Sequence, residues 1–263
     1  MDKKNIIRFL VLWVGTSCTL RCRDCCNLIP YMPQISYDEE EIFENLDYIM
    51  KEIKIDTLQI QGGEPFTHKN IGKIIEYCAN NTQISKIEIA SNGTILPDDD
   101  TICILKKYSE KVCIRFSDYD CTESRRKTII ERLEKRGVKT IEYDFVYGTG
   151  EWFDLGDLDT VKEIEREKIK ATYQKCPNKS CWTLAKNFFA GCGRMISYLH
   201  LKDEKIIGNN IIDINELRLN NKSFVDAFQI FEKNYNEKES DLCGYCRMTG
   251  KLLPAAIQLE SNK

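Results

Sequence analysis

Residues 6–25 read IIRFLVLWVGTSCTLRCRDC, an apolar run that leads directly into three cysteines. The run Ile6–Val14 is interrupted only by Arg8, and no small-residue cleavage site follows it, so it resembles a buried strand more than a signal peptide. Cys18, Cys22 and Cys25 form the pattern CxxxCxxC on the loop after this strand. The stretch therefore predicts a sheet whose first strand ends at a thiol-rich loop.

Strand and helix patterns alternate along the chain after this loop. Helical spacing of apolar residues is found in Asp38–Lys54, Asn70–Ala79, Asp98–Tyr108 and Ser124–Arg136. Strands are expected at Thr57–Gln61, Lys86–Ala90, Val112–Phe116 and Thr140–Val146. The alternation predicts a parallel sheet with right-handed crossovers, in which ligands lie at the carboxyl ends of the strands. Because five strands are too few for a closed eight-stranded barrel, we expect an α/β fold built on an open, partial (β/α) barrel.

The pattern changes after Gly148, which we take as the boundary between a first domain at 1–148 and a small α+β domain at 149–263. Helices are expected at Leu158–Thr172 and Ser223–Tyr235. Thr183–Phe189 and Arg194–Leu201 are expected to form a hairpin that turns at Ala190-Gly191. No low-complexity linker separates the two halves, so we expect them to pack together.

The composition excludes several classes of protein. The chain has 263 residues, 38 Lys and Arg against 41 Asp and Glu, and a formal net charge of -3, which disfavours a nucleic-acid partner. Two histidines, His68 and His200, are too few for a site built on several of them. No apolar run approaches the roughly 20 residues of a membrane span, so no membrane partner is expected. The thirteen cysteines are odd in number and most of them are clustered, which favours metal or redox chemistry in the cytoplasm over disulfides.

The three loop cysteines have the spacing of an iron–sulfur site. A short loop can place three thiolates around a [4Fe–4S] cluster and leave the fourth iron open. A zinc site is the alternative, but zinc ribbons pair two CxxC knuckles, and this is a single triplet. Cys26 follows Cys25 directly, and its side chain is expected to point elsewhere as a spare buried thiol. The isolated cysteines are expected in the core: Cys78, Cys103, Cys113 and Cys121.

Two more segments stand at expected strand ends, Gln61-Gly62-Gly63-Glu64-Pro65 and Ser91-Asn92-Gly93-Thr94. With the CxxxCxxC loop, they make residues 6–146 resemble the radical S-adenosylmethionine (radical SAM) enzymes. The resemblance implies a [4Fe–4S] cluster whose open iron takes SAM, and a GGEP segment that binds the SAM amino group. It also implies reductive cleavage of SAM to a 5′-deoxyadenosyl radical that takes hydrogen from substrate. The electron for this cleavage would come from an external donor such as flavodoxin or ferredoxin.

The residue chemistry agrees with these roles. Gly62 and Gly63 let the backbone approach a ligand, and Glu64 offers an anion to an ammonium group. Asn92-Gly93 suits a tight turn, and the resemblance implies that Ser117 contacts SAM. The expected cofactor-binding residues are Gln61, Gly62, Gly63, Glu64, Pro65, Ser91, Asn92, Arg115 and Ser117. Asp24 departs from the aromatic residue that many members place near adenine, and Tyr31 or the Leu28-Ile29 pair is expected to replace it.

A second group of cysteines lies in the C-terminal half, at Cys176, Cys181, Cys192, Cys243 and Cys246. One cubane needs four of them, and a zinc ion could also use four. The arrangement resembles the SPASM and shorter twitch extensions of radical SAM enzymes, which implies an auxiliary [4Fe–4S] cluster. Its expected ligands are Cys192, Cys243 and Cys246, with Cys176 or Cys181 as the fourth.

The twitch resemblance points to oxidation of a hydroxyl-bearing carbon in a small polyol, sugar or related metabolite, with the auxiliary cluster as electron acceptor. Epimerisation differs only at the end, where a thiol returns a hydrogen atom, and Cys26 or Cys121 is the expected donor. Glu151-Trp152-Phe153-Asp154 follows the fifth strand, and Glu151 or Asp154 could bind hydroxyls or take a proton. The same segment could instead be a domain-joining loop with a buried tryptophan.

Two other functions stay open. A maturase that modifies a ribosomal peptide often carries a peptide-binding domain ahead of the first strand, and only Met1–Asn5 precede it here, which disfavours that function. A non-catalytic iron–sulfur electron carrier would not need Gln61–Pro65 at a strand end. Cleavage of SAM under reducing conditions separates the carrier from both enzymes.

Overall fold

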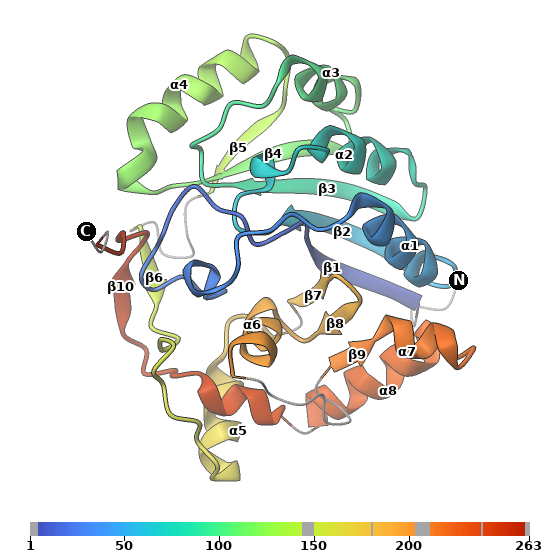
Figure 1. Cartoon of the computed structure of the whole chain (residues 1–263), viewed down its shortest axis with the longest axis vertical. Coiled ribbons are helices and arrows are strands. Elements are labelled where there is room, and N and C mark those ends of the chain that lie inside the picture. The colour runs from blue at the N-terminus through green and yellow to red at the C-terminus, as the bar shows by residue number, and fades with distance from the viewer. Residues whose placement is uncertain (1–4, 144–149, 180, 203–210, 238, 261–263) are drawn as a thin grey trace.

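A sheet of eight strands, counted over the described residues, forms the centre of the protein (Figure 1). The structure is a computed structural model that describes residues 5–143, 150–179, 181–202, 211–237 and 239–260. The strands lie in the order β5-β4-β3-β2-β1-β7-β8-β9. Their bounds are β1 Ile6–Trp13, β2 Lys54–Gln61, β3 Ile84–Ser91, β4 Val112–Ser117, β5 Thr140–Tyr143, β7 Trp182–Ala185, β8 Phe188–Ala190 and β9 Ile211–Asp213.

The pairing of these strands confirms the expected open α/β architecture. β1 to β5 pair in parallel, as alternation of strands and helices predicted. β7 joins the free side of β1, also in parallel, and β8 and β9 follow it in antiparallel pairs. The sheet therefore extends beyond the five expected strands, with β5 and β9 at its edges, and it does not close into a barrel.

The connecting helices confirm the helical spacing of the first half. α1 (Glu39–Met50), α2 (Ile71–Asn80), α3 (Asp99–Lys107) and α4 (Glu123–Glu134) alternate with the strands, and α1, α2 and α3 lie side by side in Figure 1. Asp38 caps α1, since its carboxylate accepts from the amides of Glu40 and Glu41. The helix ends at Met50, short of the expected Lys54, because the chain from Lys54 onward already belongs to β2.

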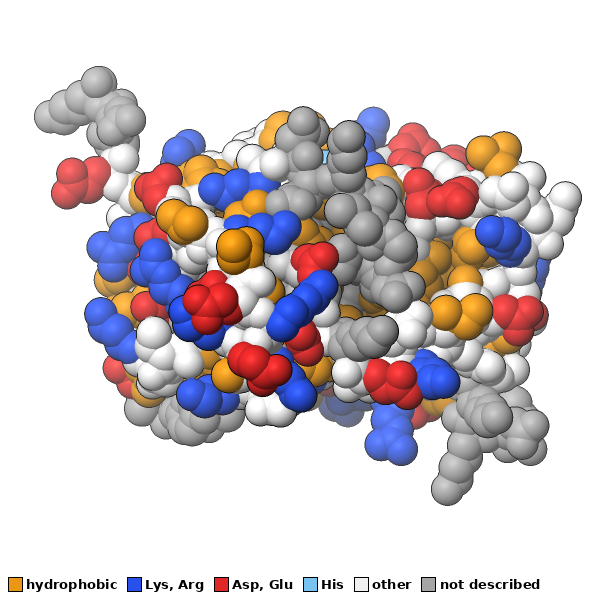
Figure 2. Space-filling view, turned by 90° about the horizontal axis from the view of Figure 1, so that it is seen from below, with side chains coloured by type: hydrophobic (Ala, Val, Ile, Leu, Met, Phe, Trp, Pro, Cys, Tyr) orange, Lys and Arg blue, Asp and Glu red, His pale blue; other side chains and the backbone are white. Residues whose placement is uncertain are grey.

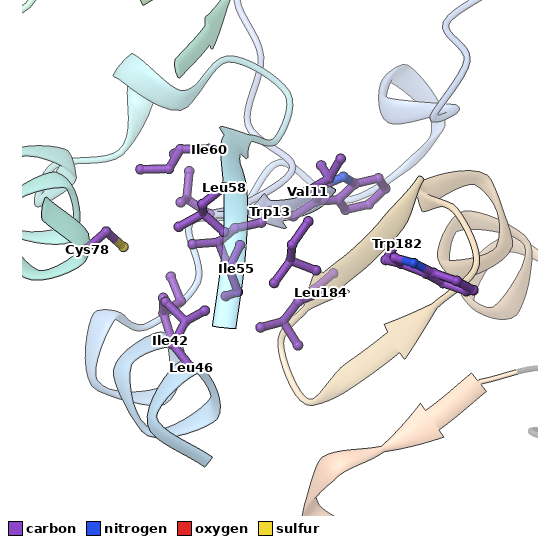
Figure 3. Close-up of a cluster of buried hydrophobic side chains, with 14 of the residues drawn as sticks. Val11, Trp13, Ile42, Leu46, Ile55, Leu58, Ile60, Cys78, Trp182 and Leu184 are labelled. Atoms are coloured by element: carbon purple, nitrogen blue, oxygen red, sulfur yellow. The ribbon is translucent and has the colours of Figure 1, made fainter. Parts of the chain in front are cut away.

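The hydrophobic core joins the two halves of the chain. Figure 3 shows side chains from β2, α1 and β7 gathered in one cluster, among them Leu58, Leu46 and Leu184, all fully buried. Trp182 of β7 continues this core into rings contributed by β8 and by α8 (Phe224–Glu237). The expected domain boundary at 148 and 149 involves residues 144–149, which lie outside the described residues, so the division into two domains stays a prediction.

The expected hairpin at Arg194–Leu201 is wrong. The chain turns earlier, at Lys186 and Asn187, where Lys186 has a left-handed φ of 51° and β7 pairs with β8. Residues 193–201 form the helix α6 (Gly193–Leu201). Met195, Ile196 and Tyr198 are buried on it, so burial on nearly all sides hid the helical period.

The remaining elements are short. The helix expected at Leu158–Thr172 is α5 (Arg166–Lys175), and it starts late because Glu163 pairs through its amide with the carbonyl of Gly244. The segment after residue 150 forms β6 (Glu151–Phe153), which pairs antiparallel with β10 (Leu252–Pro254). The other described helices are α7 (Ile214–Leu219), η2 (Ile29–Tyr31), η3 (Pro65–Thr67), η4 (Asp120–Thr122) and η5 (Asp241–Tyr245).

The surface is mixed in charge on the face seen in Figure 2, where acidic and basic side chains are interspersed. This agrees with the near balance of 38 basic and 41 acidic residues. Over the part of the chain that the structure describes, none of the helices is long and apolar enough to cross a bilayer.

Candidate functional site

A cavity of about 330 Å³ opens at the carboxyl ends of β1 to β4. This is the edge of a parallel sheet where loops from neighbouring strands converge on a ligand. Twelve of the expected cluster-ligating, cofactor-binding and catalytic residues line it: Cys18, Cys22, Cys25, Cys26, Gln61, Gly62, Gly63, Ser91, Asn92, Arg115, Ser117 and Glu151. The fold therefore brings together residues that are up to 133 positions apart, from Cys18 to Glu151.

The three loop cysteines face this cavity, and the surroundings of Cys18 and Cys22 favour the protonated thiol. Burial raises the pKa of Cys18 to about 11 and that of Cys22 to about 12, and the neighbouring thiols add to both shifts. Side-chain amides point at two of the sulfurs: Asn92 Nδ2 lies 3.7 Å from Cys18 Sγ, and Gln258 Nε2 lies 3.4 Å from Cys22 Sγ. Thiols that deprotonate on binding iron, with amide donors beside them, fit an iron–sulfur cluster.

Cys26 is not the buried spare thiol that the sequence suggested. It is exposed and lines the cavity beside Cys25. The two side chains are hydrogen-bonded, which lowers the pKa of Cys25 and raises that of Cys26. Adjacent residues can share a side because the loop leaves extended geometry here and turns, with the Leu28 amide bonded to the Cys25 carbonyl.

Gly62 and Gly63 line the cavity and also make a close contact that the sequence did not indicate. A Cβ on Gly63 would lie 2.2 Å from the carbonyl oxygen of Ser17, and one on Gly62 would lie 2.5 Å from that of Gly15. The glycines therefore let the end of β2 approach the loop that carries the cysteines. Amides of Gly63 and Glu64 donate to the same two carbonyls at 3.2 and 2.8 Å, which fixes the cysteine loop against the sheet.

Glu64 is buried and faces protein groups. Its carboxylate accepts from the amide of Asn92 at 2.7 Å, the hydroxyl of Ser91 at 3.1 Å and the amide of Phe66 at 3.2 Å. Burial raises its pKa to about 7, although these hydrogen bonds lower it. Glu64 and Pro65 are not among the cavity-lining residues, so Glu64 holds the Ser91–Asn92 turn in place and does not itself present an anion to the cavity.

The end of β4 contributes polar side chains to the cavity wall. Arg115 lies 3.6 Å from the carboxylate of Glu88, and Ser117 interacts with Tyr119. Tyr119, Gln59 and Asn27 line the same cavity, and none of them was singled out from the sequence. Gln59 could have been found, since a polar residue two positions before Gln61 on one strand faces the same side.

Two of the expected catalytic residues lie elsewhere. The carboxylate of Asp154 accepts from the amide of Gly156 at 2.9 Å and caps a turn outside the cavity. Cys121 is exposed, with its sulfur 3.7 Å from the carbonyl of Ala256. Cys103 is exposed as well, so of the isolated cysteines only Cys78 and Cys113 are in the core as expected.

The C-terminal segment covers the cysteine loop, which the sequence did not indicate. The amide of Arg23 donates to the carbonyl of Ile257, and the amide of Leu259 donates to that of Arg21. Gln258 also accepts from the amide of Arg21 at 2.8 Å through its side chain. Cys22, enclosed by this pairing, is 7% exposed. Among the residues expected to replace the aromatic residue near adenine, which are Leu28, Ile29 and Tyr31, only Ile29 lines the cavity.

A second, smaller cavity of about 30 Å³ is lined by Cys176, Cys192, Cys243 and Cys246. Cys181 lies outside it, so the structure gathers four of the five C-terminal cysteines. Burial raises the pKa of Cys246 to about 11, and it raises the pKa of Cys192 and Cys243 as well. The described residues contain no group of three or more His, Cys, Asp or Glu arranged for a single metal ion.

The two cavities share a wall. Leu155 and Asn178 line both of them, and Pro177, which lies between Cys176 and Asn178, lines the first. The helix α6 also links them, because Ser197 on it donates to the carbonyl of Asn27 at 2.5 Å, and Cys192 directly precedes its first residue. The first cavity is therefore separated from the second group of cysteines by a single layer of side chains.

Comparison with known proteins identifies the family. A family model described as the radical SAM superfamily matches residues 14–152, more than half of the chain. Among curated proteins, GTP 3′,8-cyclase from Syntrophomonas wolfei is 29% identical over 104 residues, 36% of this chain and 30% of that protein. The S-adenosylmethionine-dependent nucleotide dehydratase RSAD2 from Oncorhynchus mykiss is 33% identical over 51 residues, 18% of this chain and 15% of that protein. The matched part thus spans less than a third of either relative.

A solved structure is similar over nearly the whole chain. BtrN in complex with AdoMet and 2-DOIA has a TM-score of 0.57 and 14% identity, and the match covers 96% of this chain and 100% of that chain. At this identity the likeness concerns the fold, and it includes the C-terminal half that the family model leaves unmatched. On the family match and the geometry of the CxxxCxxC cavity, the chain belongs to the radical SAM superfamily.

Proposed function

We propose that this radical SAM enzyme oxidises a hydroxyl-bearing carbon of a small polyol, sugar or related metabolite. The family implies a [4Fe–4S] cluster and SAM. The observation that carries the proposal is the wall shared by the two cysteine-lined cavities, formed by Leu155 and Asn178. An oxidation needs an acceptor for the electron that leaves the substrate. A redox group in the second cavity would lie next to a substrate bound in the first.

The first cavity fits the family's cofactors. Cys18, Cys22 and Cys25 would hold the cluster, and the backbone of Gly62 and Gly63 with Ser91, Asn92 and Ser117 would hold SAM. When bound, these cofactors supply a radical that removes a hydrogen atom from the substrate. Glu64 would act indirectly: its carboxylate accepts a hydrogen bond from the backbone amide of Asn92, which fixes the turn there. An external donor such as flavodoxin or ferredoxin would supply the reducing electron.

The opposite wall offers groups for a hydroxylated substrate. Glu151 and Trp152 come from β6, and Asn178 comes from the loop after α5. Trp152 makes an edge-to-face contact with Tyr119, with the ring centroids 5.5 Å apart. This contact orients the Trp152 ring, which can stack on an apolar sugar face. Glu151 is the carboxylate of this wall that would accept the hydroxyl proton. Loss of that proton and one electron from the substrate radical gives a ketone, and this electron balances the one consumed in cleaving SAM.

The four thiols of the second cavity would hold the auxiliary cluster. Cys176, Cys192, Cys243 and Cys246 line this cavity and Cys181 does not, which favours Cys176 as the fourth ligand. Their chemistry suits iron–sulfur ligation, because a cubane takes four thiolates.

Epimerisation is the second candidate, and the position of Cys26 favours it. Its thiol lines the cavity, whereas that of Cys121 does not, so Cys26 would be the donor that returns hydrogen to the substrate. A thiol exchanges its hydrogen with solvent. Turnover in D₂O would therefore give an epimer with one deuterium at the reacting carbon, while oxidation would give a ketone.

The test is an anaerobic assay of the reconstituted enzyme with a panel of polyols and sugars, analysed for 5′-deoxyadenosine and for product. Ketone formed in equal amount to 5′-deoxyadenosine supports oxidation. A Cys243→Ala, Cys246→Ala double variant should keep four irons and cleave SAM, yet lose ketone formation. A folded double variant that makes ketone at the parent rate would exclude an electron-acceptor role for the second site. Deuterated epimer that disappears in Cys26→Ser would establish the alternative.

A further inference from the structure

Arg194, in the first turn of α6, is a buried cation without a carboxylate partner among the described residues. It is 4% exposed. Its guanidinium donates to the hydroxyl of Tyr198 at 2.7 Å, to the carbonyl of Cys26 at 3.0 Å and to the carbonyl of Gly156 at 2.6 Å. All three acceptors are neutral. The hydrogen bonds are satisfied, but the positive charge is not compensated by any of them.

A buried charge of this kind needs an opposite charge nearby, because removing an uncompensated charge from water is strongly unfavourable. The thiols of the second cavity can provide this negative charge when they are deprotonated. Arg194 lines this cavity together with Cys192 and Cys246. This cavity has a volume of only about 30 Å³, so the guanidinium and the thiols that line it are neighbours. Four thiolates around a cluster would carry the negative charge that this arginine lacks.

We propose that Arg194 is a positioning residue that neutralises part of the auxiliary cluster's charge and thereby makes the cluster easier to reduce. The proposal rests on the proposed function, since it takes the second cavity as a cluster site. Reduction adds a negative charge, and a fixed positive charge in a water-poor site stabilises the reduced form. The same guanidinium bonds the Cys26 carbonyl in the first site, so it lies between the donor and the acceptor of the electron.

A purely structural role predicts something different. Arg194 ties α6 to the loop after Cys25, and Ser197 makes a second tie to the same loop through the carbonyl of Asn27. If the tie alone mattered, a neutral hydrogen-bonding side chain would serve at position 194, and loss of the Ser197 tie would have a comparable effect. If charge matters, lysine at 194 would serve and glutamine would not.

The experiment is a redox titration of the reconstituted holoenzyme followed by EPR, in which the second cluster is the one whose signal does not change on adding SAM. Arg194→Gln should shift its reduction equilibrium at least tenfold toward the oxidised form, which is about 59 mV for one electron. Arg194→Lys and the control Ser197→Ala should stay within about threefold of the parent. An Arg194→Gln protein that loses the second cluster while Arg194→Lys retains it also supports the proposal.

Two results would overturn it. One is an unchanged potential in Arg194→Gln with the second cluster intact. The other is loss of the second cluster from both Arg194 variants while Ser197→Ala keeps it, since that would make the shape of the guanidinium essential and its charge irrelevant. A parent protein with four irons and no SAM-insensitive signal would refute the proposed function itself, and the iron analysis distinguishes that failure from the other two.

Discussion

At the scale of single residues, the cysteine triplet is the part of the site whose role follows most directly from its chemistry. Cys18, Cys22 and Cys25 line one cavity, and two of their sulfurs face side-chain amides from remote segments. Such amide–sulfur contacts stabilise thiolate charge on a bound cluster. The residues that support the triplet are Asn92, directly after β3, and Gln258 in the C-terminal segment, so the ligand set is local whereas its surroundings are not.

The triplet gives the first prediction. The anaerobically reconstituted protein should carry about eight irons, four per cluster. Replacing Cys18, Cys22 and Cys25 together by Ala should leave about four irons and abolish SAM cleavage, because the second cavity keeps its own thiols. Iron analysis and measurement of 5′-deoxyadenosine check both parts. A triple variant that still cleaves SAM would show that the open cluster is bound elsewhere.

Glu64 gives a prediction about pH. Burial raises its pKa from 4.5 to about 7, so the native state binds this proton more tightly than the unfolded state does. The stabilisation that comes from the protonated Glu64 is greatest below pH 4.5 and is lost as the pH rises through 7. The loss in the free energy of unfolding is about 3 kcal/mol at most. Glu64→Gln lacks this titration. Urea unfolding of both proteins in the same iron-loading state should show the parent losing stability relative to Glu64→Gln between pH 4.5 and 7. A pH-independent difference between the two would refute the raised pKa.

At the scale of elements, the C-terminal segment completes the first site. It pairs with residues 21–23 through two backbone hydrogen bonds of 2.8 and 2.7 Å and places Gln258 against Cys22. β10 just before it pairs with β6, and Figure 1 shows these two strands together at one edge of the molecule. The end of the chain thus forms both a cover over the cysteines and a support for the wall that carries Glu151.

Ending the chain at Pro254 tests this cover. The truncated protein should lose its first cluster in air several-fold faster than the parent, because Cys22 would become solvent-exposed. The second cluster should be lost no faster than it is in the parent. Bleaching of the iron–sulfur absorbance and iron analysis over time give both rates. Gln258→Met is the matched control, since it removes the amide contact to Cys22 but keeps the backbone pairing, and it should lose the first cluster more slowly than the truncated chain does. Equal rates for the parent and the truncated chain would contradict the proposed cover.

At the scale of the whole molecule, one sheet and one core span both halves of the chain. β7 pairs with β1 over four residue pairs, and Trp182 on β7 contacts rings of Phe189, Phe228 and Tyr235. Such continuity leaves little reason for the halves to unfold separately. It also holds the two cysteine-lined cavities at a fixed separation, as the proposed electron transfer between them would require.

Unfolding should therefore be a single transition that a core change in either half affects. Trp182→Ala should lower the free energy of unfolding by about 3–5 kcal/mol, because Trp182 is 4% exposed and fills the interior. Urea unfolding followed by circular dichroism and fluorescence should give coincident curves in both proteins. Leu219→Ala, at a side chain that is 84% exposed, is the control and should change stability by less than about 0.5 kcal/mol. Two separated transitions, with only one shifted by Trp182→Ala, would show that the halves are independent.

The sequence by itself determined the elements of the first half and the division of the clustered cysteines into two groups. Helical spacing and strand alternation are local properties, so α1 to α4 and β1 to β5 could be predicted within a few residues. The CxxxCxxC loop and the polar residues at strand ends could be placed in one site because parallel strands present their carboxyl ends at the same edge. The choice of residue types carried this information without any knowledge of distant contacts.

Only the tertiary structure decided which groups meet across the chain. α6 was mistaken for a strand because burial on nearly all of its sides removed the period that marks a surface helix. Gln258 lies against Cys22 because the C-terminal segment pairs with residues 21–23. Asp154 lies outside the cavity, next to the pairing of β6 with β10. Cys176 joined the second cavity and Cys181 did not, although both have suitable spacing. These outcomes depend on packing between remote segments, whose energy no local pattern contains.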